Sequence, residues 1–135
     1  MLINLNNRAL LKFSGSENEA FLQAQLSNDI SKLNEESVQI NAYCQHQGKI
    51  LALFWVIRAG DDFLLSFPLD LLDSIKTRLQ MFVLMADVKI TDVTEQYVQI
   101  GVIGKFQKDS LAINEQLSLI LADPKNLSKF DLTSQ

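Results

Sequence analysis

The only cysteine, histidine and tryptophan of this chain, Cys44, His46 and Trp55, lie within twelve positions of one another. A cysteine and a histidine two residues apart share one face of an extended strand, where the imidazole could activate the thiol as a nucleophile. The sequence shows no third residue that would orient the histidine and no oxyanion donor. We therefore interpret Cys44 as an inward-pointing strand residue and His46 as an exposed turn residue.

Gly48 and Lys49 form the other suggestive pair in this segment. A phosphate-binding loop needs several more residues of its signature and a serine or threonine after the lysine, whereas Ile50 follows Lys49 here. A glycine in a tight turn can adopt a positive φ without steric cost. The sequence therefore predicts a hairpin turn at Gly48.

Composition and charge narrow the class of protein further. The 135 residues carry 16 acidic and 12 basic side chains, a net charge of −4. This charge gives no general attraction for nucleic acid or anionic lipid, so we expect neither as a direct partner. One cysteine and one histidine are too few for a zinc site or an internal disulfide. Without a signal-peptide pattern or a membrane-length apolar run, the sequence predicts a cytoplasmic protein.

Strands must position these residues. Residues 37–44 alternate between apolar and polar, residues 50–57 are apolar on both faces, and a third strand is expected at 63–68. These strands predict an antiparallel meander. In it Phe54 and Trp55 point to opposite faces, one into the main core and the other against a helix or a missing partner surface.

Two helices are expected beside the meander. The first begins at Ser16 and Glu19, which match the capping box Ser-x-x-Glu, and ends near Leu26. The second helix is expected directly after Pro68, because the first turn of a helix tolerates proline. Its apolar positions recur at spacings of three and four, at Leu72, Ile75, Leu79 and Phe82.

The remaining segments complete the predicted domain. Ser27-Asn28-Asp29 either caps the end of the first helix or aims polar side chains into a cleft, and capping is our preferred interpretation. Residues 87–93 and 97–104 read as short strands, and 107–122 as a short helix followed by an apolar run. We predict one α+β domain over residues 1–122, an antiparallel sheet with helices packed on one face, and a frayed tail at 123–135.

Several motifs in this order resemble the amino-terminal part of YgfZ-type proteins, folate-binding relatives of the glycine-cleavage T-protein. The family pattern has a helix with Phe-Leu-Gln-x-Gln, then Ser/Thr-x-Asp-Ile/Val, a strand ending in Tyr/His-Cys, a Gly-Lys/Arg turn, and Leu-x-x-Phe/Tyr before Asp-Val. The corresponding residues are Phe21-Leu22-Gln23-Ala24-Gln25, Ser27-Asn28-Asp29-Ile30, Tyr43-Cys44, Gly48-Lys49, Leu79-Gln80-Met81-Phe82 and Asp87-Val88. The resemblance covers about residues 8–106.

The resemblance implies ferredoxin-like α/β parts around a central folate site, with a role in keeping iron–sulfur enzymes active and a link to tRNA modification. The family's Lys-Gly-Cys-Tyr-x-Gly-Gln-Glu motif has no counterpart here, so we expect either an excised first half or a naturally short version. The T-protein has an acidic pair where this chain has Ala52 and Leu53. Because neither residue ionises, aminomethyl transfer is disfavoured and binding without that reaction is expected.

The same resemblance indicates which residues would contact the ligand. A pterin ring needs apolar walls and a few fixed polar groups, and we chose the candidates on that basis. Tetrahydrofolate is the implied ligand, and the candidates are Gln25, Asp29, Tyr43, Lys49 and Trp55. The missing half or another protein would complete the site. The alternative is a non-catalytic interaction module that binds no folate and buries Phe54 or Trp55 in a homodimer.

Overall fold

The structure is a computed structural model that describes residues 1–45, 47–104, 110–130 and 132–133. Within these ranges the strands are β1 (Leu2–Asn4), β2 (Arg8–Ser14), β3 (Val38–Cys44), β4 (Ile50–Ala59), β5 (Asp62–Pro68), β6 (Lys89–Asp92), β7 (Val98–Ile103), β8 (Leu111–Ala112), β9 (Leu117–Ala122) and β10 (Leu132–Thr133). The α-helices are α1 (Asn18–Gln25) and α2 (Leu72–Val83), and the 3₁₀ helices are η1 (Ile30–Lys32), η2 (Leu69–Leu71), η3 (Thr94–Gln96) and η4 (Pro124–Lys129).

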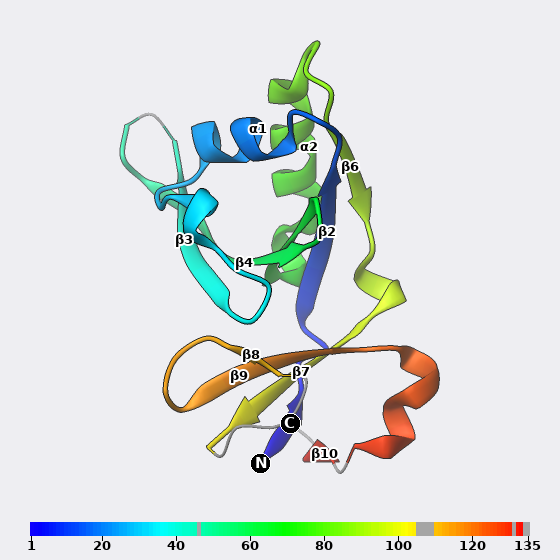
Figure 1. The fold of residues 1–135 in the computed structure, drawn as a ribbon. Coiled ribbons are helices and arrows are strands. Elements are labelled where there is room, and N and C mark those ends of the chain that lie inside the picture. Colours follow the sequence, from blue (N-terminus) through cyan, green and yellow to red (C-terminus); the bar gives the residue numbers. More distant parts are fainter. Residues whose placement is uncertain (46, 105–109, 131, 134–135) are drawn as a thin grey trace.

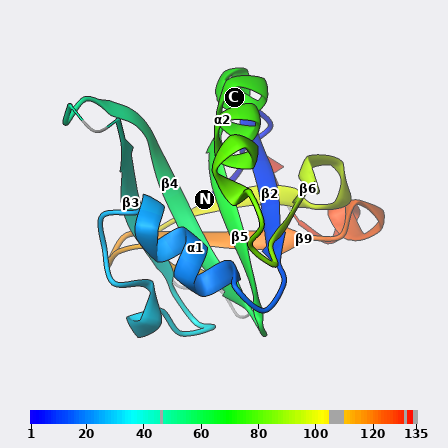
Figure 2. The ribbon, with the colours of Figure 1, turned by 90° about the horizontal axis from the view of Figure 1, so that it is seen from above.

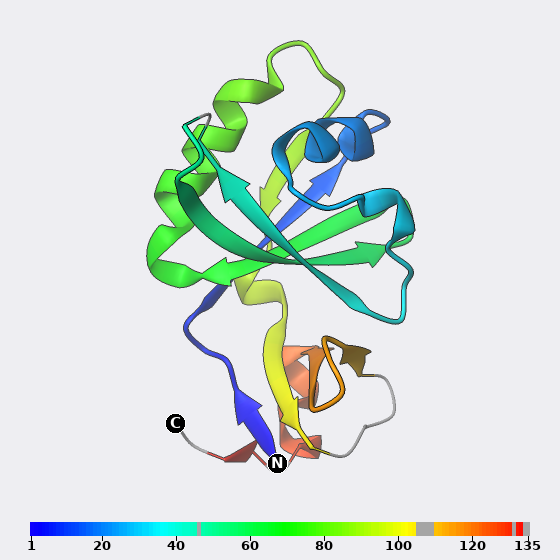
Figure 3. The same cartoon turned by 90° about the vertical axis from the view of Figure 1, so that its left-hand side faces the viewer.

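These elements form three layers (Figures 1 and 3). The first sheet has the strand order β3-β4-β5-β2-β6 and is antiparallel throughout, and both α-helices cover one of its faces. The second sheet, in the order β10-β1-β7-β9-β8, lies on the other face, and only its β1–β10 pair is parallel. The predicted α+β class, the meander and the helices on one face are confirmed. Period-two patterning did not show that the later strands belong to a separate sheet, because the pattern carries no information on pairing partners.

Two hydrophobic clusters hold the layers together. The helix-side cluster lies between the first sheet and the α-helices, and it contains Phe54 together with Phe13, Leu22, Phe67, Ile75 and Leu79. The inter-sheet cluster contains Leu10, Ile57, Leu64 and Leu119, with Trp55 packed against it. Phe54 and Trp55 therefore point to opposite faces, as the sequence predicted.

The prediction that Cys44 points into the core is wrong. Cys44 is exposed, whereas the polar residue Asn41 and Tyr43 are buried on the helix side of β3. The apolar set Val38, Ile40, Ala42 and Cys44 faces away from the helices, and the second sheet covers only its Val38 end. His46 lies outside the described residues.

The prediction of a capping box at the start of α1 is also wrong. The hydroxyl of Ser16 donates to the carboxylate of Asp87 at 2.7 Å, and Glu19 pairs with Arg58 at 2.7 Å. Glu17 occupies the N-cap position without a side-chain cap bond. Both residues of the predicted box have partners far away in the sequence, and these bonds replace the local cap. The predicted end of this helix near Leu26 is confirmed.

The segment that follows α1 protects the free edge of β3. The backbone N–H of Ala42 donates to Ser27 Oγ at 2.9 Å, and the N–H of Asn28 donates to Asn41 Oδ1 at 2.8 Å. Asp29 is the N-cap of η1 and accepts from the N–H of Ser31 at 3.1 Å. The bond from Ala42, together with one from Asn28 Nδ2 to the carbonyl of Ile40, satisfies backbone groups of β3 that would otherwise be open to pairing with another chain. Asp29 therefore caps the start of η1 and not the end of the first helix, where the sequence predicted a cap.

The carboxy-terminal half differs more from expectation. The predicted second helix is confirmed as α2, but Val83 takes the buried position and Phe82 is half-exposed. Residues 105–109 lie outside the described residues, and 110–116 contain β8 rather than the expected helix. Where a frayed tail was expected, η4 forms and β10 pairs with β1.

Candidate functional site

The structure does not gather the five predicted ligand contacts at one place. Tyr43 belongs to the helix-side cluster, and Trp55 packs on the opposite face of the sheet. Gln25 ends α1 beside Tyr43, because the next residue of the chain forms a β-bridge with Tyr43. Asp29 is exposed and its carboxylate is engaged by Ser31, which holds its pKa below the ordinary value. Lys49 is exposed in the hairpin turn.

Tyr43 is the most buried of the five, with 2% of its surface exposed. Its ring stacks on Phe54 with a centroid distance of 5.6 Å, and burial raises the pKa of its phenol. The Arg78 guanidinium favours the phenolate and opposes part of that rise. In this position Tyr43 packs the hairpin against the helices.

Apolar side chains stay open to solvent on the other face of the hairpin. Ile40, Ile50 and Leu53 are 45%, 57% and 53% exposed, and Trp55, directly opposite Ile40, is half-buried. We call these four residues the open strip. The turn end of the β3–β4 hairpin extends away from the second sheet, which therefore leaves this part of the face uncovered (Figures 1 and 2).

An irregularity in the hairpin puts these residues on one side. The register shifts between Tyr43, which pairs with Ala52, and Cys44, which pairs with Ile50. Leu51 and Ala52 consequently both pack toward the helix-side cluster. A β-bulge of this kind places two consecutive residues against one partner and redirects the strand. It leaves Ile50 and Leu53 exposed on the other face.

Arg8 borders the open strip. Its guanidinium carbon lies 3.8 Å from the centroid of the Trp55 ring, an arrangement with cation–π attraction. Arg8 Nε donates to Ser66 Oγ and Arg8 Nη2 donates to Ser66 O, both at 2.8 Å. Ser66 Oγ also donates to the side chain of Gln99 on β7, which links the two sheets. Burial lowers the pKa of Arg8 to about 10, so it remains charged at neutral pH.

Sequence reasoning did not select Arg8, Ser66 or Gln99. Arg8 and Ser66 are 58 positions apart, and Gln99 lies 33 positions beyond Ser66. They meet because β2 and β5 are paired and the second sheet packs on that face. An arginine at the start of an apolar strand was the one available signal, since a charged residue there needs a polar partner or an open edge.

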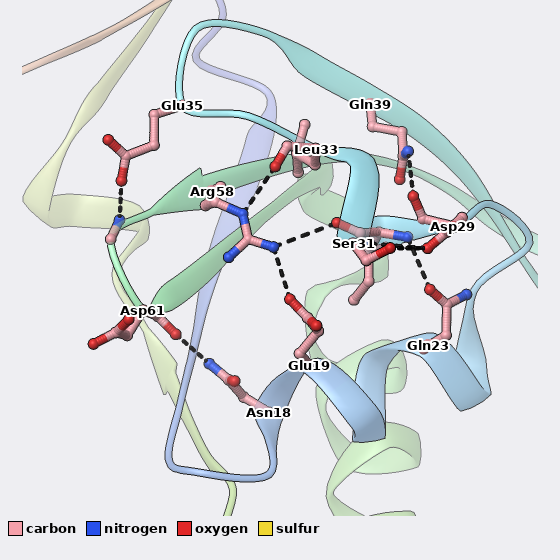
Figure 4. Close-up of polar contacts among 12 residues, drawn as sticks. Asn18, Glu19, Gln23, Asp29, Ser31, Leu33, Glu35, Gln39, Arg58 and Asp61 are labelled. Carbon is pink, nitrogen blue, oxygen red and sulfur yellow. Dashed lines mark hydrogen bonds and ion pairs between the residues drawn. The ribbon is translucent and has the colours of Figure 1, made fainter.

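A second polar cluster lies on the helix side around Arg58 (Figure 4). Arg58 Nε donates to Leu33 O at 2.9 Å, and its Nη2 donates to Glu19 at 2.7 Å. Asn18 Nδ2 donates to Asp61 O at 2.9 Å. A hollow of about 460 Å³ adjoins Asn18, Glu19, Arg58 and Asp61. Because its buried groups already have protein partners, this cluster ties α1 and η1 to the end of the β4–β5 hairpin.

The described part of the chain holds no group of three or more histidine, cysteine, aspartate or glutamate residues that could bind a metal ion. In the same residue ranges, no helix has the length and apolar character needed to cross a membrane.

Comparison with solved structures defines the class of fold. The glycine cleavage system aminomethyltransferase T of Bartonella henselae superposes with a TM-score of 0.75, covering 95% of this chain and 44% of that chain at 13% sequence identity. The fold is therefore that of the aminomethyltransferase T-protein. No protein-family model matches the sequence.

Curated sequences are similar at higher identity. The tRNA-modifying protein YgfZ of Colwellia psychrerythraea is 31% identical over 114 residues, which are 84% of this chain and 35% of that protein. The tRNA-modifying protein YgfZ of Enterobacter sp. is 30% identical over 103 residues, 76% of this chain and 31% of that protein. The predicted resemblance to YgfZ-type proteins is confirmed. The chain spans about a third of the length of these curated relatives.

Proposed function

We propose that this chain supplies one wall of a tetrahydrofolate-binding site, as part of a YgfZ-type protein that acts in tRNA modification and in the maintenance of iron–sulfur enzymes. The proposal rests on similarity to YgfZ proteins over 84% of the chain, together with a T-protein fold. The observation that carries the binding step is the open strip, a solvent-exposed apolar face beside a fixed positive charge.

The open strip fits the chemistry of a folate. A pterin and a benzoyl ring require apolar or aromatic walls, and the glutamate end carries carboxylates. Ile50 and Trp55 pair with Cys44 and Ile40, which are four positions apart on β3. The two residues therefore lie roughly 13 Å apart along the strand, which is the scale of the ring system of a folate. Burying apolar surface is worth about 25 cal/mol per Å², so covering these half-exposed side chains favours binding.

Aminomethyl transfer is not part of the proposal. Ala52 is buried in the helix-side cluster and Leu53 is exposed on the open strip. Neither side chain can ionise, so neither can act on a reacting amine as a carboxylate would. The chain is proposed to bind the folate without that reaction at these positions.

A fluorescence titration tests the proposal, because Trp55 is the only tryptophan and belongs to the open strip. Tetrahydrofolate is expected to quench Trp55 emission in a saturable way, with the same dissociation constant by calorimetry. Leu53→Asn should weaken binding about tenfold or more, since the loss of a buried leucine contact costs about 1.5 kcal/mol or more. Ile103→Asn is the matched control, because Ile103 is a half-exposed strand residue of the second sheet.

The alternative of an interaction module gives a different result in the same samples. There the open strip would be covered by a second copy of the chain, because large apolar patches rarely stay open in monomers. Sedimentation would show a dimer that Leu53→Asn dissociates, and tetrahydrofolate would leave the fluorescence unchanged. That outcome would replace the folate proposal.

A further inference from the structure

Arg8 carries a positive charge that no acidic side chain balances within the described ranges. The ion pairs found there are Lys12–Asp62 at 3.5 Å and Arg58–Glu19 at 2.7 Å, and neither includes Arg8. A half-buried charge without an opposite charge loses part of its hydration. This accounts for the pKa of about 10 that burial gives Arg8. The protein thus maintains an uncompensated cation at the border of the open strip.

The Arg8 guanidinium is held in one orientation. Ser66 receives two of its N–H groups, one at the hydroxyl and one at the carbonyl, and Trp55 supports its flat face. A guanidinium has five N–H donors, and the remaining ones have no partner among the described residues. Planar guanidinium groups with free N–H donors bind carboxylates in a charge-assisted manner. Arg8 is therefore pre-oriented for an anionic group.

We propose that Arg8 binds the carboxylate end of the ligand whose ring system lies on the open strip, so that the site selects folates with a free glutamate carboxylate. This inference rests on the proposed folate function. The apolar residues Ile40, Ile50 and Leu53 contact the rings, and Arg8, beyond Trp55, contacts the glutamate carboxylate. A ligand without the carboxylate loses the Arg8 contact and keeps the apolar ones.

Arg58 provides a matched comparison. It is also half-buried and also lies over an aromatic ring, with its guanidinium carbon 4.6 Å from the Phe63 centroid. Its charge is satisfied by Glu19, and it sits on the helix side of the sheet. Arg58→Gln therefore removes a guanidinium of similar burial without touching the open strip.

The experiment measures the binding of two probes, tetrahydrofolate and its glutamate dimethyl ester, to the full chain and its variants by calorimetry. The ester keeps both rings and removes the negative charge of the carboxylates. For the unaltered protein, tetrahydrofolate should bind at least tenfold more tightly than its dimethyl ester. Arg8→Gln should remove that difference by weakening tetrahydrofolate alone. Arg8→Lys, which keeps a charge without the planar fork, should retain part of it. Arg58→Gln should leave the preference unchanged.

The outcomes separate the two claims. If both probes bind the unaltered protein equally, or if folded Arg8→Gln keeps the preference, the Arg8 inference is overturned while folate binding stands. If neither probe binds, the proposed function fails and the inference falls with it. Thermal unfolding followed by circular dichroism identifies variants that fold. If Arg8→Gln does not fold, loss of the preference on adding 1 M salt to the unaltered protein supports the inference, and a preference unchanged by salt contradicts it.

Discussion

At the residue scale, Asp87, which belongs to one of the sequence motifs, forms hydrogen bonds with a residue far away in the sequence. Its carboxylate accepts from the backbone N–H of Ser16 at 3.0 Å and from the Ser16 hydroxyl at 2.7 Å. A Cβ added at Gly15 would lie 2.2 Å from the Asp87 carbonyl oxygen, so this close approach requires glycine. Asp87 thereby fastens the turn before α1 to the loop after α2.

The Asp87 bonds predict a pH dependence of stability. They hold the pKa of Asp87 below its ordinary 3.8, so the folded state binds this proton less readily than the unfolded state. The stabilisation is present above the ordinary carboxyl pKa and is lost as pH falls through the lowered value. The free energy of unfolding, measured with urea, should therefore fall less for Asp87→Asn than for the unaltered protein on acidification below about pH 4.

Asp73→Asn serves as the control for this prediction. Asp73 lies on the exposed face of α2 and accepts no hydrogen bond from the described residues. Its substitution should leave the acid dependence as it is in the unaltered protein. An equal acid dependence in all three proteins would contradict the role assigned to Asp87.

At the element scale, the connection after α2 contains a strained turn. The N–H of Ala86 donates to Val83 O at 2.9 Å, and the first central residue, Leu84, has φ 49° and ψ −116°. These angles are those of a type II′ turn, whose first central position favours glycine because a Cβ is crowded there. Leu84 is 85% exposed, so its side chain contributes little packing in return.

Leu84→Gly is accordingly expected to stabilise the protein by about 1 kcal/mol, through relief of backbone strain. Chemical denaturation at constant m-value measures the change. Met85→Gly, at the neighbouring and fully exposed position, should instead be neutral or destabilising by up to about 1 kcal/mol, because glycine gains freedom in the unfolded chain. Destabilisation by Leu84→Gly would show that the Leu84 side chain makes a stabilising contact.

Local patterns predicted the elements better than their faces or caps. Period-two alternation predicted β3, an apolar run bounded by turns predicted β4, and period-3.6 spacing predicted α2, because these signals depend only on neighbouring residues. The helices cover the face of β3 that carries Asn41 and Tyr43, and not the more apolar face that carries Cys44. The alternation along the strand could not show which of the two faces the helices would cover. The capping box at Ser16 failed for a similar reason, since its hydroxyl found Asp87 71 positions away.

At the scale of the whole molecule, the two sheets and the helix layer decide which face of the hairpin is available. The helices bury one face, and the second sheet covers only part of the other, so the open strip remains (Figure 1). Trp55 was selected from the sequence, whereas Arg8 emerged only when the pairing of β2, β5 and β7 was known. Tyr43, which the sequence also suggested as a ligand contact, lies on the opposite face and packs the hairpin against the helices.

Methyl NMR during a tetrahydrofolate titration tests folate binding at the open strip most directly. If folate binds there, the methyl signals of Ile40, Ile50 and Leu53 and the indole signal of Trp55 should shift in a saturable way. Methyl signals of Ile103 and Leu84, which are exposed elsewhere, should stay in place. Shifts confined to other residues, or none at saturating ligand, would contradict the account.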